Sequence, residues 1–482
     1  MGKSIKINFI FNLINTVTSL LFPLITFPYV SRILLPEGIG IVNFYQSIIQ
    51  YIVLFSSLGI PMYAIRETAK YRDDRRKCSI TTLEILSLHF ILTFIGYLIV
   101  FILCCTVSEV KENIPLFLIL SVQLLFVVIG CEWFYQGVED FKYITIRSII
   151  VRTLAVIFLF IFVKSREDIL FYGIYCVAGI YAGNIFNFFR LRKYLDFSVI
   201  RELKPLKHLK PALKIFVLNL IISLYVNLNS IMLGFLKGPE SVGLFTSATK
   251  ITQILLGVTS ALGTVMLPRL SNLIANKNYE EFSRLANIAT KFMFAVTLPL
   301  SVAVILLADN LILLLSGDAY ADAILTLQII SFIIFAIGLS GVLGIQILYP
   351  QGKESIVIKS TAVGAVMNLL LNFILIPKFS HHGAAVATLL AEIGVTATMA
   401  FIGKRFVPVK WRDKEFINYF IGTLLMGSGV FMVSYLEMNI IYELIISFIV
   451  GSIIYAIYLK LMNDSIFNMT AGRLINKINH KG

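Results

Sequence analysis

Long apolar stretches recur along the whole chain, and short polar segments separate them. Twelve stretches lack Asp, Glu, Lys and Arg, and two more reach the same length if an interior charge is accepted. A membrane-spanning helix needs about 20 mostly apolar residues, so each stretch predicts one span. The first stretch is too long for the apolar core of a signal peptide, so we expect it to remain as a helix. The fourteen predicted spans cover residues 7–31, 38–65, 85–108, 113–131, 143–163, 169–189, 215–236, 251–268, 292–308, 323–352, 360–377, 380–403, 416–436 and 444–459.

Composition excludes a water-soluble globule. Of 482 residues, 58% are hydrophobic and 14% are charged, whereas globular proteins carry about 25% charged residues. The longest hydrophilic linker, residues 190–214, leaves no room for a soluble catalytic or nucleotide-binding domain. No phosphate-binding G-x-x-x-x-G-K, H-E-x-x-H or D-x-D motif occurs, and the five cysteines form no C-x-x-C. We therefore predict an all-α polytopic membrane protein that is not an enzyme and has no bound cofactor.

The distribution of Lys and Arg predicts the orientation. If both termini lie in the cytoplasm, 33 of the 41 basic residues fall in cytoplasmic segments, six in outward loops and two inside spans. Cytoplasmic segments of membrane proteins are enriched in Lys and Arg. The net charge of +14 is therefore a property of membrane topology and does not predict nucleic-acid binding.

An internal repeat divides the chain. Residues 36–40 (PEGIG) and 239–243 (PESVG) share Pro, Glu and the last Gly, and further Gln, Ser and Arg identities follow at the same offset. The repeat predicts two similar lobes of six helices each, with two more helices appended. We place the N-terminal lobe at 1–200, the C-terminal lobe at 201–403, and helices 13 and 14 with the cytoplasmic tail at 404–482. Folds built in this way place substrate between the lobes and rock one lobe against the other.

Three segments carry a resemblance to a known family. Residues 22–32 (FPLITFPYVSR) with 36–40, then 132–137 (EWFYQG), and then 383–388 (GAAVAT) resemble signatures of bacterial oligosaccharide flippases of the polysaccharide transporter family. This family belongs to the multidrug/oligosaccharidyl-lipid/polysaccharide exporter superfamily. The resemblance implies a protein of the bacterial inner membrane that moves undecaprenyl-diphosphate-linked repeat units to the periplasmic leaflet during synthesis of O-antigen or another surface polysaccharide.

Two cations lie deep within predicted spans. A charge near the centre of a span costs about 2.5–3.5 kcal/mol, so Lys250 and Arg152 are candidates for function. Arg offers phosphate a planar fork and Lys a mobile point charge. A more distant likeness to the lipid II flippases also places Lys250 on a basic residue that those proteins use for substrate. We therefore predict a cationic cavity between the lobes. The basic residues expected near its two mouths are Arg32, Arg66, Arg147, Arg269 and Lys359.

Each of these assignments has an alternative. Ordinary membrane anchoring is the favoured alternative for Arg66, Arg147, Arg269 and Lys359. An internal salt bridge with Glu132 or Glu392 accounts for the two deep cations.

Several polar residues within the predicted spans are candidates for binding an ion that drives transport. Asn368 and Asn372 are four residues apart and share one helix face, and Asn229 and Thr388 align with them on a sodium site of some lipid II flippases. Oxygen ligands suit a hard cation, although Asn stands here where that site has a carboxylate. Hydrogen bonding between helices is the alternative role for these residues. A proton carried by Glu392, by Glu132 or by His89 is a second candidate for coupling.

Three other kinds of protein are alternatives to a flippase. A multidrug exporter of the same superfamily would need acidic and aromatic groups for cationic drugs. A membrane-embedded polymerase or glycosyltransferase would need a long outward loop or a carboxylate pair, and a structural scaffold would not need deep charges. The expected partners are the lipid-linked oligosaccharide, membrane lipids, and a polysaccharide polymerase with its chain-length machinery, and we expect a monomer.

Overall fold

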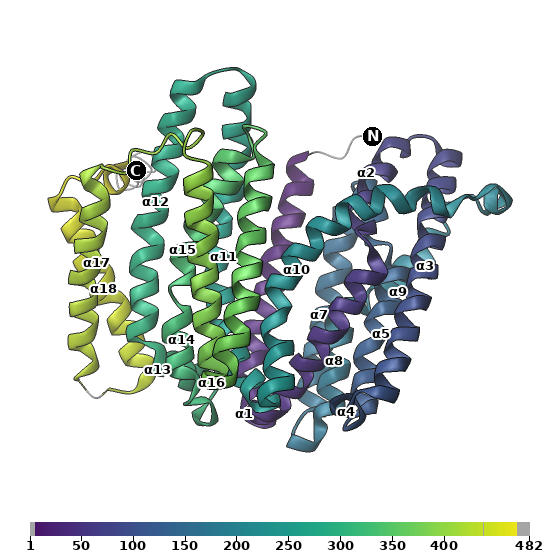
Figure 1. Ribbon diagram of the computed structural model, residues 1–482, viewed down its shortest axis with the longest axis horizontal. Coiled ribbons are helices and arrows are strands. Elements are labelled where there is room, and N and C mark those ends of the chain that lie inside the picture. Colours follow the sequence, from purple (N-terminus) through teal and green to yellow (C-terminus); the bar gives the residue numbers. More distant parts are fainter. Residues whose placement is uncertain (1–4, 437, 470–482) are drawn as a thin grey trace, which may run out of the picture. The chain divides into compact units, whose positions relative to one another are not determined.

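The protein is helical throughout the residues that the computed structural model describes, 5–436 and 438–469 (Figure 1). The predicted all-α membrane fold is confirmed. Contacts group the chain into two compact units, residues 1–243 and 244–482, while the lobe boundaries after residues 200 and 403 stay predictions. The first part of the chain contains α1 (Ile5–Ser57), α2 (Ile60–Tyr71), α3 (Arg75–Thr106), α4 (Ser108–Lys111), α5 (Ile114–Gly130), α6 (Glu132–Gly137), α7 (Phe141–Phe162), η1 (Arg166–Asp168), α8 (Ile169–Tyr181), α9 (Asn184–Leu191), η2 (Phe197–Glu202), η3 (Pro205–His208) and α10 (Leu209–Lys237).

The second part begins with α11 (Pro239–Ala275), whose first residues belong to the first unit. Within it α17 and α18 lie side by side (Figure 1). The elements that follow α11 are α12 (Tyr279–Leu306), α13 (Ala308–Leu315), η4 (Asp318–Tyr320), α14 (Ala323–Ile330), α15 (Ile333–Gly341), η5 (Val342–Leu348), α16 (Glu354–Ile402), α17 (Lys414–Ser434) and α18 (Ile440–Leu461).

Two helices are too long to be single spans. At about 1.5 Å per residue, the 53 residues of α1 would extend roughly 80 Å, far beyond the ~30 Å hydrocarbon core. The backbone of α1 leaves the helical region at Leu35 (φ 56°), next to Pro36, where a helical conformation is disfavoured. The 49-residue α16 breaks in the same way at Ser380 (φ 51°). The break at Leu35 falls between two predicted spans, and the break at Ser380 falls on the first residue of the predicted span 380–403.

The helices are apolar enough to cross a membrane several times. Within the described chain, nine helices meet the length and composition of a span, or ten if the bent pair Arg166–Tyr181 and Asn184–Leu191 is counted as one. Large apolar side chains on these helices are exposed, including Phe101 at 67%, Met432 at 72% and Phe448 at 73%. Such a large exposed apolar surface is unfavourable in water and favourable in lipid. The protein is therefore a multi-pass membrane protein, and the count of fourteen spans stays a prediction.

Polar side chains cap the helices where they begin. Asp74 accepts a hydrogen bond from the Lys77 backbone N–H (3.0 Å) at the start of α3, and this bond lowers the pKa of its carboxyl. Asn278 caps α12 through the N–H of Glu281 (3.2 Å). Such caps satisfy N–H groups that a helix leaves unpaired in its first turn. They also mark the polar ends of the apolar spans.

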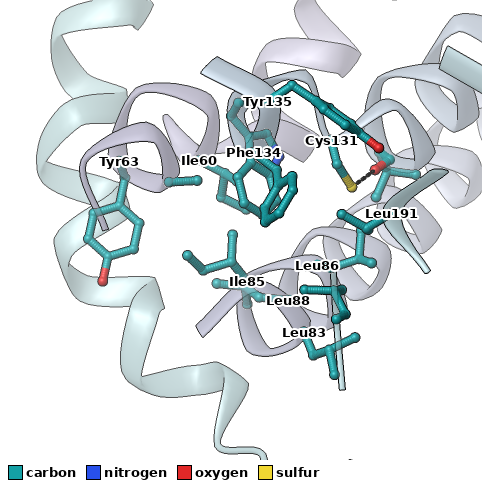
Figure 2. Close-up of a cluster of buried hydrophobic side chains, with 14 of the residues drawn as sticks. Ile60, Tyr63, Leu83, Ile85, Leu86, Leu88, Cys131, Phe134, Tyr135 and Leu191 are labelled. Carbon is teal, nitrogen blue, oxygen red and sulfur yellow. Dashed lines mark hydrogen bonds between the residues drawn. The ribbon is translucent and has the colours of Figure 1, made fainter. Parts of the chain in front are cut away.

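A buried cluster in the first unit holds the short helices α2 and α6 against α3. The side chains of Ile60, Ile85 and Phe134 point toward one another, and Tyr135 and Leu191 lie beside them (Figure 2). All five side chains are almost completely buried. Because α6 is packed in this way, the charged residues that flank it have fixed positions.

The second unit has its own core. Its centre is formed by α12, α15, α16 and the π-helix η5, with Ala286, Val342, Leu343 and Ile347 fully buried. The backbone of η5 passes close to α16, since the Met399 side chain lies about 3.1 Å from where a Cβ on Gly344 would stand. This packing leaves the polar residues of α16 on a rigid element.

The two copies of the repeated motif contact each other. A Cβ on Gly40 would overlap the carbonyl oxygen of Pro239, and a Cβ on Gly243 would overlap the carbonyl oxygen of Pro36. The contact is reciprocal, since equivalent residues of each copy meet the other. Only glycine allows backbone segments to approach so closely. The final Gly of each motif is therefore a packing requirement.

Candidate functional site

Arg147 forms the centre of a buried polar cluster in the first unit. Its side chain is 6% exposed, and Nη2 lies 3.3 Å from the Glu132 carboxylate. Nη1 donates to Asn184 Oδ1 at 3.4 Å. Glu132 opens α6 directly after Cys131, whose left-handed backbone (φ 41°) ends α5 and turns the chain. The structure thus brings together two predicted site residues, Arg147 and Glu132, as an ion pair.

Arg152 has a different environment. It lies one and a half turns further along α7 and is partly buried. Its Nη1 donates to Asn15 Oδ1 (3.1 Å), to the Asn15 carbonyl oxygen (3.2 Å) and to Thr18 Oγ1 (3.0 Å), all on α1. No carboxylate of the described residues is within ion-pair distance of Arg152. Neutral oxygens therefore hold this cation in place and leave its charge uncompensated by direct contact.

The remaining predicted cations lie at several places. Lys250 is partly buried on α11, in the second unit. Arg32 is exposed and donates to the Pro28 carbonyl oxygen at 2.7 Å. Arg66 is exposed, 3.4 Å from Glu67. Two more, Arg269 and Lys359, are exposed on α11 and α16.

The predicted coupling residues on α16 are almost completely buried. Asn372 Nδ2 donates to Asn368 Oδ1 at 3.0 Å, so the two amides share one helix face as predicted from their spacing. Thr388 Oγ1 donates to the Ala384 carbonyl oxygen at 2.8 Å. Glu392 is buried on the same helix, 6% exposed. The fifth predicted coupling residue, Asn229, is buried on α10 and belongs to the first unit.

Sequence reasoning missed a second buried cluster, around Glu84. This carboxylate is 1% exposed at the start of α3 and accepts from the Lys204 N–H (2.9 Å), Lys207 Nζ (2.6 Å) and His208 Nε2 (3.1 Å). The Tyr63 hydroxyl lies 2.7 Å from the other ring nitrogen of His208. Burial lowers the pKa of His208, while Glu84 acts in the opposite direction. The cluster ties the segment that precedes α10 to α2 and α3.

A third polar cluster ties α12 to α17. Lys291 Nζ contacts Asp413 (2.5 Å) and Glu415 (2.8 Å). The hydrogen bond from Lys291 lowers the pKa of the Asp413 carboxyl. No pattern in the sequence marks either missed cluster, because the residues that pair with Glu84 and with Lys291 lie at least 120 positions away along the chain.

His381, His382 and His89 have ordinary partners. Both His381 Nδ1 and His382 Nδ1 contact the Thr326 hydroxyl, at 2.7 and 2.9 Å. His89 Nε2 lies 3.4 Å from the Ser57 hydroxyl. In the part of the chain that the structure describes, no group of three or more His, Cys, Asp and Glu side chains could hold a metal ion.

Comparison with known sequences and structures gives concordant results. The profile of the family described as "Polysaccharide biosynthesis protein" matches residues 5–274, and the MatE profile matches residues 215–374. A protein of Escherichia coli (strain K12) named "Putative O-antigen transporter" is 28% identical over 398 residues, covering 82% of this chain and 96% of that protein.

Two solved structures share the fold. The lipid II flippase MurJ in an inward closed conformation is 16% identical, with a TM-score of 0.64 over 92% of this chain and 98% of that chain. A MATE family multidrug resistance transporter in an inward-facing conformation is also 16% identical, with a TM-score of 0.65 over 84% of this chain and 96% of that chain. At this level of identity the structures support the fold alone.

Proposed function

Because the chain belongs to the polysaccharide biosynthesis protein family, we propose that it flips lipid-linked oligosaccharide repeat units across the bacterial inner membrane. The observation that carries the proposal is the family match, which covers more than half of the chain. The nearly full-length similarity to a protein named for O-antigen transport is consistent with it. The multi-pass helical fold, shared with a lipid flippase, supplies the architecture for such transport.

The proposed substrate is carried on undecaprenyl diphosphate and moves from the cytoplasmic to the periplasmic leaflet. Both termini would lie in the cytoplasm, and the lobes would alternate access to a cationic cavity. We expect a monomer that supplies a polysaccharide polymerase and its chain-length machinery.

Arg152 is the best-supported ligand for the diphosphate within the first unit. Its guanidinium is held only by Asn15 and Thr18 oxygens among the described residues. A phosphate oxygen can replace such neutral acceptors and gain a charge-assisted bond. Lys250 is proposed as the second deep ligand, with Arg32, Arg66, Arg147, Arg269 and Lys359 guiding the substrate near the mouths.

The decisive experiment follows the substrate. A deletion strain should accumulate lipid-linked repeat units that face the cytoplasm, and proteoliposomes with purified protein should expose such units to an added glycosidase. Arg152→Gln should slow flipping at least tenfold, whereas Lys111→Gln, which changes an exposed cation at the end of the short helix α4, should not. Normal flipping by Arg152→Gln at equal protein content would remove Arg152 from the mechanism. Unchanged lipid-linked pools in the deletion strain would contradict the flippase itself.

Ion coupling is proposed through α16. The buried amides of Asn368 and Asn372, together with Thr388 on the same helix, are candidates for sodium ligands. Asn229 is a separate candidate in the first unit, and Glu392 and Glu132 are candidates for a proton carrier. Flux into proteoliposomes with independently imposed sodium and pH gradients separates these two ions. A flux that responds to neither gradient would contradict both.

A further inference from the structure

A groove of about 600 Å³ lies between α7 and α9 in the first unit. Its apolar wall is formed by Ile146 and Ile150 of α7 and by Phe186 of α9, which are 44%, 54% and 59% exposed. The groove therefore opens onto the outer surface of the unit. In a protein that crosses a membrane, a surface of this kind is in contact with lipid.

One end of the groove is cationic. Lys142, Arg147 and Arg190 line it, opposed by Asp140 alone among the lining residues. Arg190 pairs with Asp140 at 2.7 Å and stacks on the Tyr143 ring, 3.8 Å from its centroid. The ion pairs described above leave two uncommitted donors. Lys142 is exposed, and the buried Nε of Arg147 has no hydrogen-bond acceptor among the described residues.

Along both α7 and α9, a cation stands near the polar end of the groove and apolar side chains follow further along it. Lys142, Ile146 and Ile150 follow one face of α7 at intervals of four residues and extend about 12 Å inward from its first turn. On α9, Arg190 occupies the last turn and Phe186 lies one turn before it. Both cations therefore stand at the polar end of a span, where lipid headgroups lie, and the apolar residues stand deeper.

We propose that this groove binds an anionic glycerophospholipid, with its phosphate among Lys142, Arg147 and Arg190 and an acyl chain along Ile146, Ile150 and Phe186. Basic pockets between membrane helices recognise anionic headgroups in this way. The chemistry of the lining selects this occupant over the glycan-bearing substrate. Ile146, Ile150, Val151 and Phe186 line its length, and they suit an acyl chain better than sugar hydroxyl groups.

The site is distinct in chemistry from the proposed Arg152 ligand position. Arg152 is held by polar side chains of α1, whereas the groove offers cations at one end and hydrocarbon along its length. A phospholipid bound there would pack α7 against α9 and neutralise the local excess of positive charge. Its effect is therefore expected on stability and lipid retention.

Native mass spectrometry of the purified full-length protein tests the proposal, with equimolar phosphatidylglycerol and phosphatidylcholine as probes. We expect retention of phosphatidylglycerol over phosphatidylcholine, and roughly fivefold weaker retention in Lys142→Gln. That change corresponds to the ~1 kcal/mol that one basic residue contributes at an anionic surface. Lys164→Gln, which changes an exposed cation beyond the other end of α7, is the matched control. Thermal melting in the two lipids should follow the same order.

Three results would overturn the proposal. Equal retention of the two lipids by the wild-type protein would show that the groove does not distinguish an anionic headgroup from a zwitterionic one. An equal loss in Lys164→Gln would show a general surface effect. Displacement of phosphatidylglycerol by glycerol phosphate alone, or by the lipid-linked oligosaccharide at stoichiometric amounts, would assign the groove to another occupant. None of these measurements depends on flipping.

Discussion

Glu84 offers a direct test of how the first unit is held together. Its buried carboxylate binds three donors from residues 204–208, the segment that leads into α10. Replacing Glu84 with Ala removes all three bonds and leaves the Lys204 N–H and the buried His208 Nε2 without this acceptor. We expect the segment to open locally while the apolar cluster of Ile60, Ile85 and Phe134 persists.

The size of the effect follows from the contacts. Hydrogen bonds to a charged group contribute about 1.5–3 kcal/mol each. The Lys207 side chain is 52% exposed, so water screens its ion pair, which adds at most ~1 kcal/mol. Breaking a buried pair by removing one partner costs about 3–5 kcal/mol. We take the lower end, ~3 kcal/mol, which raises the open population roughly a hundredfold.

Limited trypsin digestion measures this population, because cleavage after Lys207 requires an open segment. When opening and closing are faster than cleavage, the rate follows the open fraction. Glu84→Ala should be cut roughly a hundredfold faster than the wild type. Glu84→Gln, which keeps one side-chain oxygen, should be cut roughly tenfold faster. The protein should elute as a folded species in both cases.

Glu202→Ala is the control within the same linker. Glu202 pairs with Arg76 at 2.7 Å, and both side chains are at least half exposed, so its loss should change cleavage by less than about fivefold. Equal cleavage of Glu84→Ala and the wild type would refute the assigned role of Glu84. A Glu202→Ala rate as high as that of Glu84→Ala would show that any loss of charge loosens the linker.

Three further predictions concern other contacts. Because burial lowers the pKa of His208, the folded state binds its proton less readily than the unfolded state, so stability should be full above about pH 6.5 and fall below it; thermal melts at pH 8 and pH 5 check this, and a flat profile contradicts it. Gly40→Ala should lose about 1–3 kcal/mol through overlap with the backbone of the second motif, whereas Gly341→Ala, which meets no atom within 4 Å, should melt like the wild type. Glu132→Gln and Arg147→Gln should be non-additive by about 1 kcal/mol in a double-mutant cycle of melting stability, since the two side chains form one ion pair; simple additivity would argue against the pair.

The sequence predicted the helices well because apolar length is a local property. The gap between the first two predicted spans coincides with the break at Leu35, and the gap near residue 379 coincides with the break at Ser380. The spacing of Asn368 and Asn372 also predicted their shared face. The helix breaks and the shared face depend on residues only a few positions apart along the chain, so a single sequence is enough to predict them.

Partners across the chain could not be predicted in this way. The position of Arg147 near the end of a span predicts a place at a mouth of the cavity, and the structure adds that its side chain is buried and paired with Glu132. Arg152 was recognised as a deep charge, but its acceptors are 134 to 137 residues away on α1. Side-chain pairing depends on how helices rotate against one another, and hydropathy does not determine that rotation.

The partners of the buried arginines bear on which of them a diphosphate can bind. A diphosphate that took over Arg147 would have to displace the Glu132 carboxylate, and at Arg190 the Asp140 carboxylate, whereas the phospholipid phosphate proposed for the groove lies beside these ion pairs and leaves them intact. Displacing the buried Asp140 carboxylate leaves a desolvated negative charge beside the incoming one, which is unfavourable at low dielectric, whereas Glu132 is 41% exposed and its displacement costs less. Arg152 is bound by neutral oxygens of Asn15 and Thr18, which can exchange for phosphate without such a penalty. A deep position in the membrane therefore makes an arginine a candidate for binding the diphosphate. Whether a carboxylate or a neutral oxygen already holds the arginine then decides between candidates, and this places Arg152 ahead of Arg147 and Arg190.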